Sequence, residues 1–327
     1  MTDRIFNWGL LSTAKINRAL IKPLNASKRT RLLAVASRNQ FSADAYAREW
    51  RIPRAHGSYE ALLADPEIDV IYNSLPNHLH AEWTIKALRA GKHVLCEKPL
   101  GLSLEEVDAM IRASHESGKA LAEAFMYRHH PQTVKVKEIV DSGKLGKLQF
   151  IRGSFTYKLS REGNYRAIKE MGGGSIWDVG CYPISYARML VGEEPAEVFG
   201  WQVEGPGGSD DSFVGQIRFP NNVLAQFDSS FKFQFRAQME IVGTDGALMI
   251  PSPFKPNRNC EIILKEGNNE KKIRIRSEEL YRYEVENFVD VILHNASPQV
   301  TLADSRGNII AILALLASAE RNQPVSI

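Results

Sequence analysis

An alternation of strand-like and helix-like segments over the first 125 residues is the feature that most constrains the fold of this chain. Short apolar runs alternate there with segments in which apolar residues recur at helical spacing. We expect strands at 5–11, 31–36, 69–74, 93–96 and 119–124, and helices at 14–24, 42–50, 80–89 and 103–117. Because strands that alternate with helices form parallel sheets, this pattern predicts a doubly wound α/β domain over residues 1–124.

The pattern changes after Met126. A helix is expected at 132–142, and apolar and polar residues then alternate with a period of two in several segments. These expected strands lie at 148–157, 196–204, 211–219, 223–231 and 235–243. The alternation predicts an α+β domain over residues 125–327 with a large, mostly antiparallel sheet whose open face could form an oligomer interface. The final helix, 302–322, is unusually apolar, and we expect it to dock on the first domain.

Charge and cysteine content exclude several classes of protein. The 41 basic and 38 acidic residues are interspersed, whereas a nucleic-acid-binding protein would concentrate basic residues on one face. No signal peptide and no uninterrupted apolar run of about 18 residues is evident. The three cysteines, Cys96, Cys181 and Cys260, are too scattered for a disulfide framework or a zinc knuckle. We therefore expect a cytoplasmic protein without a nucleic-acid partner, a membrane partner or a metal.

The turn after the first expected strand should be glycine-rich if it binds a dinucleotide, because the backbone must approach the pyrophosphate at a helix N-terminus. Here it reads Ser12-Thr-Ala-Lys-Ile-Asn17, with small or polar residues where the fingerprint has three glycines. Ser12 and Thr13 could cap the helix and also donate hydrogen bonds to phosphate. An ordinary helix cap is the alternative interpretation.

The second expected strand ends in Ser37-Arg38. Enzymes that use NAD usually place an acidic residue at this point to hold the ribose 2′-hydroxyl. A serine and an arginine instead suit a 2′-phosphate, which an arginine binds by charge-assisted hydrogen bonds. The pair favours NADP over NAD, although a solvated loop arginine would look the same in the sequence.

Glu97-Lys98-Pro99 follows the fourth expected strand directly. Ligands of open α/β sheets bind at the carboxyl ends of the strands. Pro99 restricts the backbone of Lys98, so the ammonium group would be presented from a stiff segment, and Glu97 could orient it. The segment is a better active-site candidate than an ordinary surface lysine.

A third informative segment contains Gly172-Gly-Gly-Ser and then Asp178 and Tyr182. Four positions separate the last two, so an α-helix would place them on one face. Oxidation of an alcohol by hydride transfer needs a group that accepts the hydroxyl proton, and a tyrosine can do so if a nearby lysine lowers its pKa. Lys98 and Tyr182 make such a pair, whereas a buried tyrosine with a satisfied hydroxyl is the structural alternative.

Together with Leu75-Pro-Asn-His-Leu-His80 and Phe125-Met-Tyr-Arg-His-His-Pro131, these motifs resemble the glucose–fructose oxidoreductase/inositol dehydrogenase/rhizopine catabolism (Gfo/Idh/MocA) family over nearly the whole chain. The resemblance implies a Rossmann domain and a second domain whose open sheet mediates homodimers or homotetramers. It also implies that Lys98 is the catalytic lysine. Many members have a histidine where this chain has Tyr182, and the tyrosine form resembles a branch with NADP-dependent xylose dehydrogenase and dimeric dihydrodiol dehydrogenase, in which the tyrosine is the proposed acid/base.

The motifs and the resemblance together give a set of expected site residues. The catalytic residues are expected to be Lys98, Tyr182 and Asp178. Cofactor contacts are expected from Ser12, Thr13, Ala14, Lys15, Ile16, Ser37, Arg38, Ser74, Leu75, Asn77, His80, Glu97, Lys98 and Arg128. Substrate contacts are expected from Lys98, Asn164, Arg166, Asp178 and Tyr182.

The resulting hypothesis is an NADP(H)-dependent oxidoreductase that transfers a hydride between nicotinamide and a carbinol or carbonyl carbon of a sugar or polyol. Tyr182 would exchange the proton, Lys98 would lower its pKa, and Asp178 would orient substrate hydroxyls. Two alternatives stay open: a trans-dihydrodiol dehydrogenase acting on non-sugar substrates, and a non-catalytic NADP-binding regulator of the same fold. The exact substrate and the direction of the reaction are also open.

Overall fold

The computed structural model describes residues 4–327, which fold into two compact units. The first unit extends to His129 and also includes Tyr281–Ser305. The second unit comprises His130–Leu280 and Arg306–Ile327. The division therefore falls a few residues after the expected boundary at 124, and it assigns a C-terminal segment to the first unit that the sequence pattern placed in the second.

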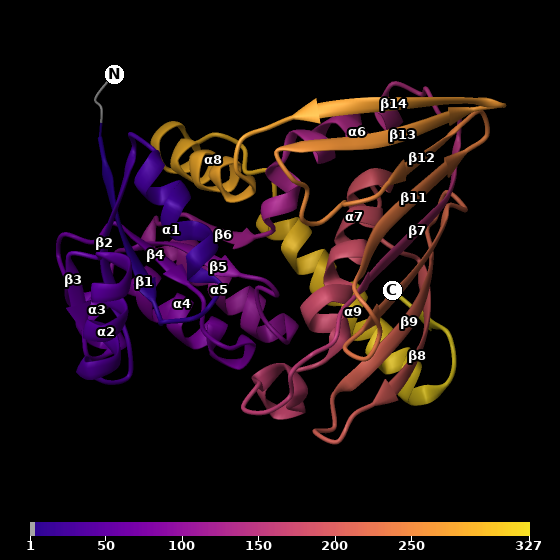
Figure 1. The fold of residues 1–327 in the computed structure, drawn as a ribbon. Helices are drawn as coiled ribbons and strands as arrows, with labels where there is room; N and C mark the ends of the chain where they lie inside the picture. Colours follow the sequence, from indigo (N-terminus) through magenta and orange to yellow (C-terminus); the bar gives the residue numbers. More distant parts are fainter. Residues whose placement is uncertain (1–3) are drawn as a thin grey trace. The chain divides into compact units, whose positions relative to one another are not determined.

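A six-stranded parallel sheet forms the centre of the first unit, with the strand order β3-β2-β1-β4-β5-β6 (Figure 1). Its strands are β1 (Phe6–Leu11), β2 (Thr30–Ala36), β3 (Arg54–His56), β4 (Val70–Asn73), β5 (His93–Glu97) and β6 (Leu121–Ala124). Its helices are α1 (Asn17–Ala26), α2 (Gln40–Trp50), α3 (Tyr59–Ala64), α4 (His80–Arg89), α5 (Leu104–Ser117) and α8 (Leu280–His294). This is the order of a Rossmann domain, and it confirms the predicted doubly wound sheet.

Helix α8 completes the core of the first unit. Trp8 of β1 is fully buried and meets Phe288 of α8 edge to face, with 6.0 Å between ring centroids. On the rim, Arg29 forms ion pairs with Glu286 and Asp290 of the same helix. Apolar packing and the ion pairs of Arg29 thus explain why α8 belongs with this sheet.

A nine-stranded sheet dominates the second unit, with the order β14-β13-β12-β11-β7-β10-β9-β8-β15. Its strands are β7 (Leu148–Thr156), β8 (Glu197–Glu204), β9 (Asp210–Arg218), β10 (Leu224–Ser230), β11 (Arg236–Gly243), β12 (Ala247–Ile250), β13 (Asn259–Glu266), β14 (Asn269–Arg276) and β15 (Val325–Ser326). All neighbours pair antiparallel except β7 and β10, which are parallel. The sheet confirms the predicted large, mostly antiparallel architecture.

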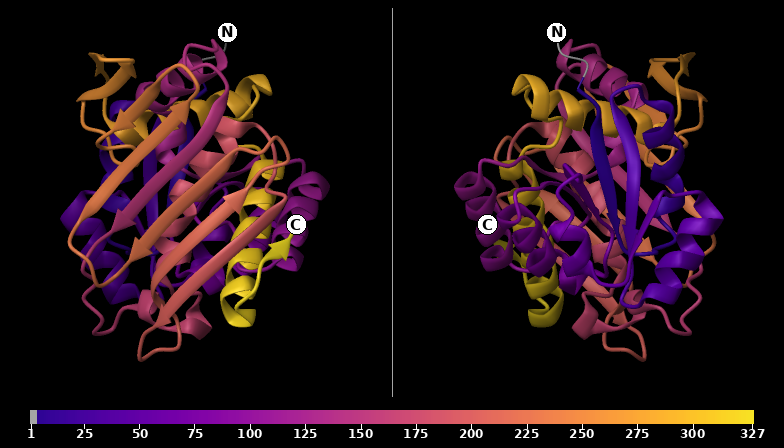
Figure 2. Two further views of the ribbon diagram at one scale, coloured as in Figure 1. Left: turned by 90° about the vertical axis from the view of Figure 1, so that its right-hand side faces the viewer. Right: turned by 90° about the vertical axis from the view of Figure 1, so that its left-hand side faces the viewer.

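One face of this sheet is packed and the other is open. Helices α6 (Pro131–Asp141), α7 (Cys181–Val191) and the later part of α9 (Leu302–Arg321) lie on the packed side. Figure 2, left, shows the open face, over which no helix of the second unit lies within the described chain. Inward-pointing aromatic residues such as Phe213 and Phe227, which stack with their rings 6.0 Å apart, form the core beneath the sheet. An antiparallel sheet commonly has one such exposed face.

The last helix, α9, is long and apolar enough to cross a membrane by length and composition alone. Its sequence nevertheless contains charged residues such as Arg306, and it was expected to be a packed helix. Half of its most apolar window is buried, and Ile309, Ile312 and Leu315 are fully buried. Ser318 accepts a hydrogen bond from the backbone N–H of Gly200 on β8 at 3.1 Å. These contacts are those of a core helix of the second unit.

Candidate active site

The turn that follows β1 has a backbone conformation typical of glycine, although it contains no glycine. Ser12 has a φ of 149°, a conformation that L-residues rarely adopt and glycine adopts freely. Its hydroxyl bonds with the Ser74 hydroxyl at 2.9 Å, and the Asn17 side-chain amide donates to the Ser12 carbonyl at 2.7 Å. Side chains therefore hold the turn in the shape that glycines would allow. The expected capping role is wrong, because α1 begins only at Asn17, and its N-cap residue Ile16 makes no side-chain cap.

In this turn a buried serine supports the backbone while a lysine is exposed to solvent, an arrangement that fits a phosphate site. Ser12 is buried and braces the turn, Thr13, Ala14 and Ile16 are half-buried, and Lys15 is exposed. The turn lies between β1 and α1 at the carboxyl edge of the sheet, where β1 separates β2 from β4. Dinucleotides bind at this position in open α/β sheets. The geometry therefore fits the predicted cofactor segment.

The end of β2 presents one basic side chain at the same edge. Ser37 is buried, and its backbone N–H donates to the His56 carbonyl at 3.0 Å, which fixes the end of the strand. Arg38 is exposed, and Asn39 caps α2 by accepting the Ser42 N–H at 2.8 Å. An exposed guanidinium at the end of a rigid strand suits a 2′-phosphate better than a 2′-hydroxyl.

The segment after β4 is held by one buried imidazole. Ring Nδ1 of His80 lies 2.7 Å from the Pro99 carbonyl, and Nε2 lies 2.8 Å from the Leu75 carbonyl. Burial lowers the pKa of His80 to about 4, although both backbone hydrogen bonds oppose this shift. The ring ties the β4 turn, with Ser74, Leu75 and Asn77, to the loop after β5. Both hydrogen bonds of the His80 ring are to backbone carbonyls and stabilise the loops. Direct contact of His80 with a cofactor stays a prediction.

Glu97 at the end of β5 is fixed from two directions. The Tyr72 hydroxyl of β4 donates to Glu97 Oε1 at 2.5 Å, and the Lys98 backbone N–H donates to Oε2 at 3.3 Å. Burial, and next the charge of Glu97, raise the pKa of Tyr72, so its hydroxyl remains a donor. Lys98 is half-buried, and its peptide bond to Pro99 is cis. Sequence reasoning missed Tyr72, because a tyrosine within an apolar strand resembles any other core residue.

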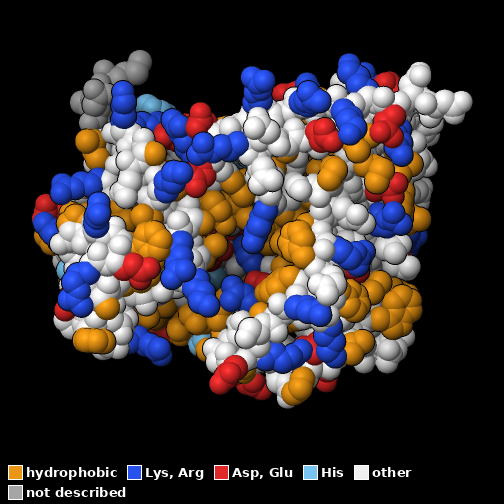
Figure 3. Space-filling model, viewed as in Figure 1, with side chains coloured by type: hydrophobic (Ala, Val, Ile, Leu, Met, Phe, Trp, Pro, Cys, Tyr) orange, Lys and Arg blue, Asp and Glu red, His pale blue; other side chains and the backbone are white. Residues whose placement is uncertain are grey.

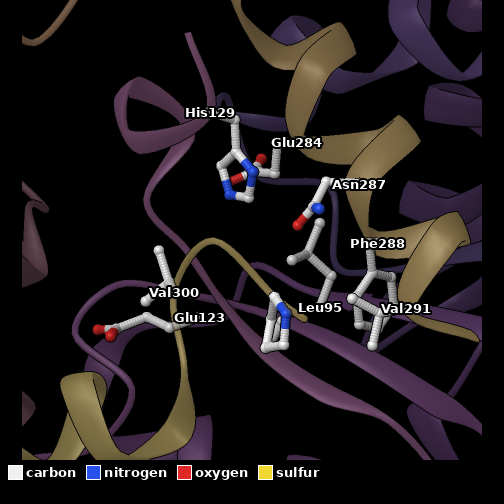
Figure 4. Close-up of a pocket in the computed structure, with 10 residues that line it drawn as sticks. Leu95, Glu123, His129, Glu284, Asn287, Phe288, Val291 and Val300 are labelled. Carbon is white, nitrogen blue, oxygen red and sulfur yellow. The ribbon is translucent and has the colours of Figure 1, made fainter. Parts of the chain in front are cut away.

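A small cavity with mostly apolar walls lies within the first unit. Figure 4 shows His129, Glu284 and Asn287 at one end of it, with Leu95 of β5 and Phe288 of α8 among its apolar walls. It leaves about 10 Å³ for the centre of a water molecule, which is room for about one water. Burial lowers the pKa of His129 to about 3, and burial together with the charge of Glu97 raises that of Glu284. Burial thus favours the uncharged form of both groups, and the cavity is a packing feature.

Arg128, expected near the cofactor, pairs with an acidic residue of the same unit. Its Nη1 lies 2.8 Å from Asp304 Oδ2, and the side chain is buried. The pair joins the end of the first segment of this unit to the C-terminal segment that completes it. Contact of Arg128 with the cofactor remains a prediction.

In the second unit, the Gly172–Gly174 segment leads into an irregular helix. Residues Ile176–Gly180 form a π-helix that continues into α7. Asp178 lies in the π-helix and Tyr182 in α7, so they do not share one regular α-helix as expected. Single π turns of this kind occur frequently at functional sites.

The Asp178 carboxylate is held by two side chains. Tyr157 donates its hydroxyl to Oδ2 at 2.6 Å, and Arg166 Nε donates to Oδ1 at 2.9 Å. Burial, and next the charge of Asp178, raise the pKa of Tyr157, so the phenol stays protonated. Burial disfavours the charge on Arg166, but Asp178 more than offsets this and raises its pKa. The expected residues Arg166 and Asp178 thus meet, and Tyr157 joins them, although spacing alone could not place it.

Two further expected residues have clear places in the second unit. Tyr182 is 5% exposed and packs against Phe155 and Phe254, with ring centroids 5.3 and 5.4 Å away. Asn164 caps a short helix by accepting the Arg166 N–H at 3.2 Å, and it donates to the Ser160 carbonyl at 3.0 Å. Asn164 therefore shapes the loop that presents Arg166, and its contact with substrate stays a prediction.

The expected site residues form two groups, one in each unit. The first unit brings the cofactor candidates and Lys98 to the carboxyl edge of its sheet. The second brings Asp178, Arg166 and Tyr157 together one turn before Tyr182. Lys98 and Tyr182 belong to different units, so their pairing stays a prediction.

Comparison with known proteins covers nearly the whole chain. Residues 6–125 match the model of the oxidoreductase family with an NAD-binding Rossmann fold, and residues 133–249 match that of the GFO/IDH/MocA C-terminal domain. D-xylose 1-dehydrogenase (NADP(+)) 2 of Haloferax volcanii is 34% identical over 324 residues, 98% of this chain and 99% of its own. A trans-1,2-dihydrobenzene-1,2-diol dehydrogenase of Danio rerio is 33% identical over 249 residues, 75% of this chain and 74% of its own.

A solved structure agrees at the level of the fold. The 3-ketoreductase KijD10 of Actinomadura kijaniata, solved with NADP and TDP-benzene, superposes with a TM-score of 0.91 at 27% identity and covers 96% of this chain and 98% of its own. The expected resemblance is thereby confirmed on both units. The chain belongs to the Gfo/Idh/MocA family of oxidoreductases.

Proposed function

We propose that this oxidoreductase transfers a hydride between NADP(H) and a carbinol or carbonyl carbon of a sugar or related polyol. The observation that carries the proposal is the gathering of the expected cofactor residues at the carboxyl edge of the parallel sheet. Strands β1, β2, β4 and β5 all end at this edge, and Arg38 is exposed in the turn after β2. The names of the xylose dehydrogenase and of the NADP-bound ketoreductase support both the cofactor and the substrate class.

The residues of the first unit suit NADP. The backbone of the Ser12 turn would approach the pyrophosphate, and Arg38 would bind the 2′-phosphate. When bound, NADP supplies or accepts the hydride at its nicotinamide ring. Lys98 would hydrogen-bond the reacting oxygen of the substrate from the stiff segment at the end of β5.

The residues of the second unit suit a polyhydroxylated substrate. Tyr182 would exchange the hydroxyl proton, with Lys98 stabilising its phenolate form. Asp178 would orient neighbouring substrate hydroxyls, because its carboxylate is already held by Tyr157 and Arg166 and does not need to be ordered on binding. Two solved variants of KijD10 carry a replaced lysine and a replaced tyrosine, which are as far apart in that chain as Lys98 and Tyr182 are here.

The test is reduction of NADP+ with a panel of aldoses, inositols and ketosugars, followed by the same assay on two variants. Lys98→Met and Tyr182→Phe should each lower turnover by at least about a hundredfold. Binding of NADP+ to both, measured by calorimetry, should match that of the wild type. Activity close to wild type in either variant would refute the assignment of that residue.

A trans-dihydrodiol substrate is the second candidate. The similarity to the Danio rerio enzyme, whose name states such a substrate, favours it. The same assay should therefore include aromatic trans-dihydrodiols. A dihydrodiol with a higher kcat/KM than every sugar would move the assignment to this substrate class and keep the roles of Lys98 and Tyr182.

We further propose that the open face of the nine-stranded sheet pairs copies of this chain as a homodimer or homotetramer. Trp201 and Leu224 are about half exposed on this face, and a hollow of about 260 Å³ lies beside Phe150 and Phe199. Contiguous apolar surface of this kind is typical of interaction sites. Light scattering should give a multiple of 36.7 kDa, and the double variant Trp201→Arg, Leu224→Glu should give the monomer mass.

We also propose a cytoplasmic location without nucleic-acid or membrane partners. None of the three cysteines forms a disulfide, and Cys96 and Cys181 are buried. Figure 3 shows basic and acidic side chains interspersed over the visible surface. Fractionation of cells that produce a tagged copy tests the location, and retention on immobilised DNA or vesicles would contradict the absence of those partners.

A further inference from the structure

Two adjacent buried aspartates at the start of β9 lie outside every site discussed so far. Asp210 and Asp211 are 4% and 0% exposed. The pairing of β8 with β9 shifts between Val203 and Glu204, so that Asp211 is the extra residue of a β-bulge. Bulges re-aim side chains and are frequent next to active sites. The bulge places two consecutive carboxylates in the interior of the second unit.

Asp210 holds the start of the π-helix that carries Asp178. Its Oδ2 accepts the Ser175 hydroxyl at 2.5 Å and the Ile176 backbone N–H at 3.0 Å. The Ser175 hydroxyl oxygen also lies 2.9 Å from the Ser229 hydroxyl oxygen on β10. Gly174 precedes this contact with a φ of +129°, and a side chain there would overlap Asp210 Oδ1. The glycine and the aspartate therefore fit each other closely.

Asp211 holds the second segment of the same site. Its carboxylate forms ion pairs with Arg161 and with Lys232, the latter at 3.2 Å. Arg161 lies in the loop that leads to Arg166, one of the two partners of Asp178. The start of β9 thus anchors both segments that meet at the Asp178 carboxylate, one through Asp210 and the other through Asp211.

We propose that Asp210 is a positioning residue for the reaction: in its ionised form it fixes the π-helix so that Asp178 is aligned for the substrate. The inference rests on the proposed function, because Asp178 is the substrate-orienting group in that proposal. It assigns Asp210 no contact with the substrate or the cofactor.

The chemistry of the contact indicates which form of Asp210 acts. An ionised carboxylate is the better acceptor for two converging donors, since charge-assisted hydrogen bonds are roughly twice as strong as neutral ones. Burial raises the pKa of Asp210 to about 7, and the hydrogen bonds from Ser175 and Ile176 oppose that shift. Other acids on these elements are paired: Asp178 with Arg166, Asp211 with Lys232 and Arg161, and Asp228 with Arg236.

The test compares the full-length wild type with Asp210→Asn, which keeps one oxygen acceptor and removes the charge. At pH 8, KM for the substrate found in the panel should rise roughly tenfold, as expected for weakening two hydrogen bonds to a charged acceptor. The wild-type KM should rise towards the variant's value as the pH falls from 8 to 6, while the variant's KM stays flat over that range. The affinity for NADP+ should not change.

Asp65→Asn is the matched control, because Asp65 is also a buried aspartate that accepts a backbone N–H, at 3.0 Å from Glu67, but it lies in the first unit. It should leave the substrate KM and its pH dependence unchanged. A control that raises KM as much as Asp210→Asn does, or an Asp210→Asn enzyme with the wild-type KM and pH profile, would overturn the inference.

Hydrogen exchange of the Ser175–Gly180 peptide gives a measurement that does not depend on turnover. Exchange at pH 8 should be at least about tenfold faster in Asp210→Ala and in Ser175→Ala than in the wild type, because each removes part of the same contact. Unchanged exchange in both would refute the role of Asp210 even if no substrate is found. Failure of the whole substrate panel combined with faster exchange would refute only the proposed function.

Discussion

Replacing Asp210 by asparagine should make the protein more stable relative to the wild type as the pH rises. The folded-state pKa of about 7 lies above the ordinary value of 3.8, so the folded chain holds this proton more tightly than the unfolded chain does. The stabilising effect of the bound proton is present in full below pH 4 and is lost as the pH rises to about 7. A pKa difference of about three corresponds to about 4 kcal/mol over the whole range.

The assay is urea unfolding of the wild type and Asp210→Asn between pH 5 and pH 8. All other titrations cancel in the difference between the two proteins. That difference in the free energy of unfolding should therefore change by about 3 kcal/mol in favour of the variant, almost all of it below pH 7. A difference that does not depend on pH, or one that moves towards the wild type, would refute the reasoning.

Asp65→Asn should behave differently in the same experiment. Burial alone would raise the pKa of Asp65, but the Glu67 N–H and Arg54 more than offset burial and lower it. The stability that Asp65 contributes is thus already complete at pH 5 and is lost only at lower pH. Its difference from the wild type should stay constant from pH 5 to pH 8, which separates the effect of Asp210 from a general effect of removing a buried charge.

Three other substitutions test single contacts. Arg38→Ala should raise KM for NADP+ about tenfold to a hundredfold and leave that for NAD+ unchanged, because it removes charge-assisted bonds to the 2′-phosphate; equal effects on both cofactors would contradict that role. Tyr157→Phe should raise the substrate KM roughly tenfold with unchanged binding of NADP+, since Asp178 loses the hydrogen bond from the Tyr157 hydroxyl; an unaffected KM would contradict this. Glu284→Gln should change the free energy of unfolding at pH 7 by less than about 1 kcal/mol, because burial and the charge of Glu97 raise the pKa of that carboxyl and so favour its uncharged form; a large loss in urea unfolding would contradict this.

The sequence predicts regular elements well wherever one residue period decides burial. Five of the six parallel strands of the first unit and the long strands β7 to β11 lie within a few residues of their expected positions. The sequence does not predict the short strands β3 and β12, nor β13 and β14, because alternation is weak in β13 and most side chains of β14 are exposed. Helix α8 was missed although its apolar residues recur at helical spacing, and only the structure shows that these residues complete the first unit.

Site residues could be predicted where the chemistry is local and not where it depends on tertiary contacts. Arg38 and Lys98 follow from their position at strand ends, and Asp178 from its glycine-rich approach. Tyr72 and Tyr157 do not, because a tyrosine on a strand gives no sign of the carboxylate that its hydroxyl will meet. Asp210 looks in the sequence like a turn residue after Gly207-Gly-Ser, and only the register of β9 turns it inward.

Three departures from local rules lie at or beside the candidate site, and they support the assignment independently of any resemblance. Ser12 adopts a glycine-like backbone, the helix at Asp178 gains a residue per turn, and β9 gains a residue at Asp211. Each departure costs stability that ordinary packing would not require, and natural sequences accept such costs mainly at functional sites. The π-helix at Asp178 and the bulge of β9 are joined by the hydrogen bond from the Ser175 hydroxyl to Asp210. A change of either one to regular geometry would therefore displace the other. A neutral residue in place of Asp210 would avoid the cost of burying a charge above pH 7, and the proposed alignment of Asp178 gives this buried acid a function.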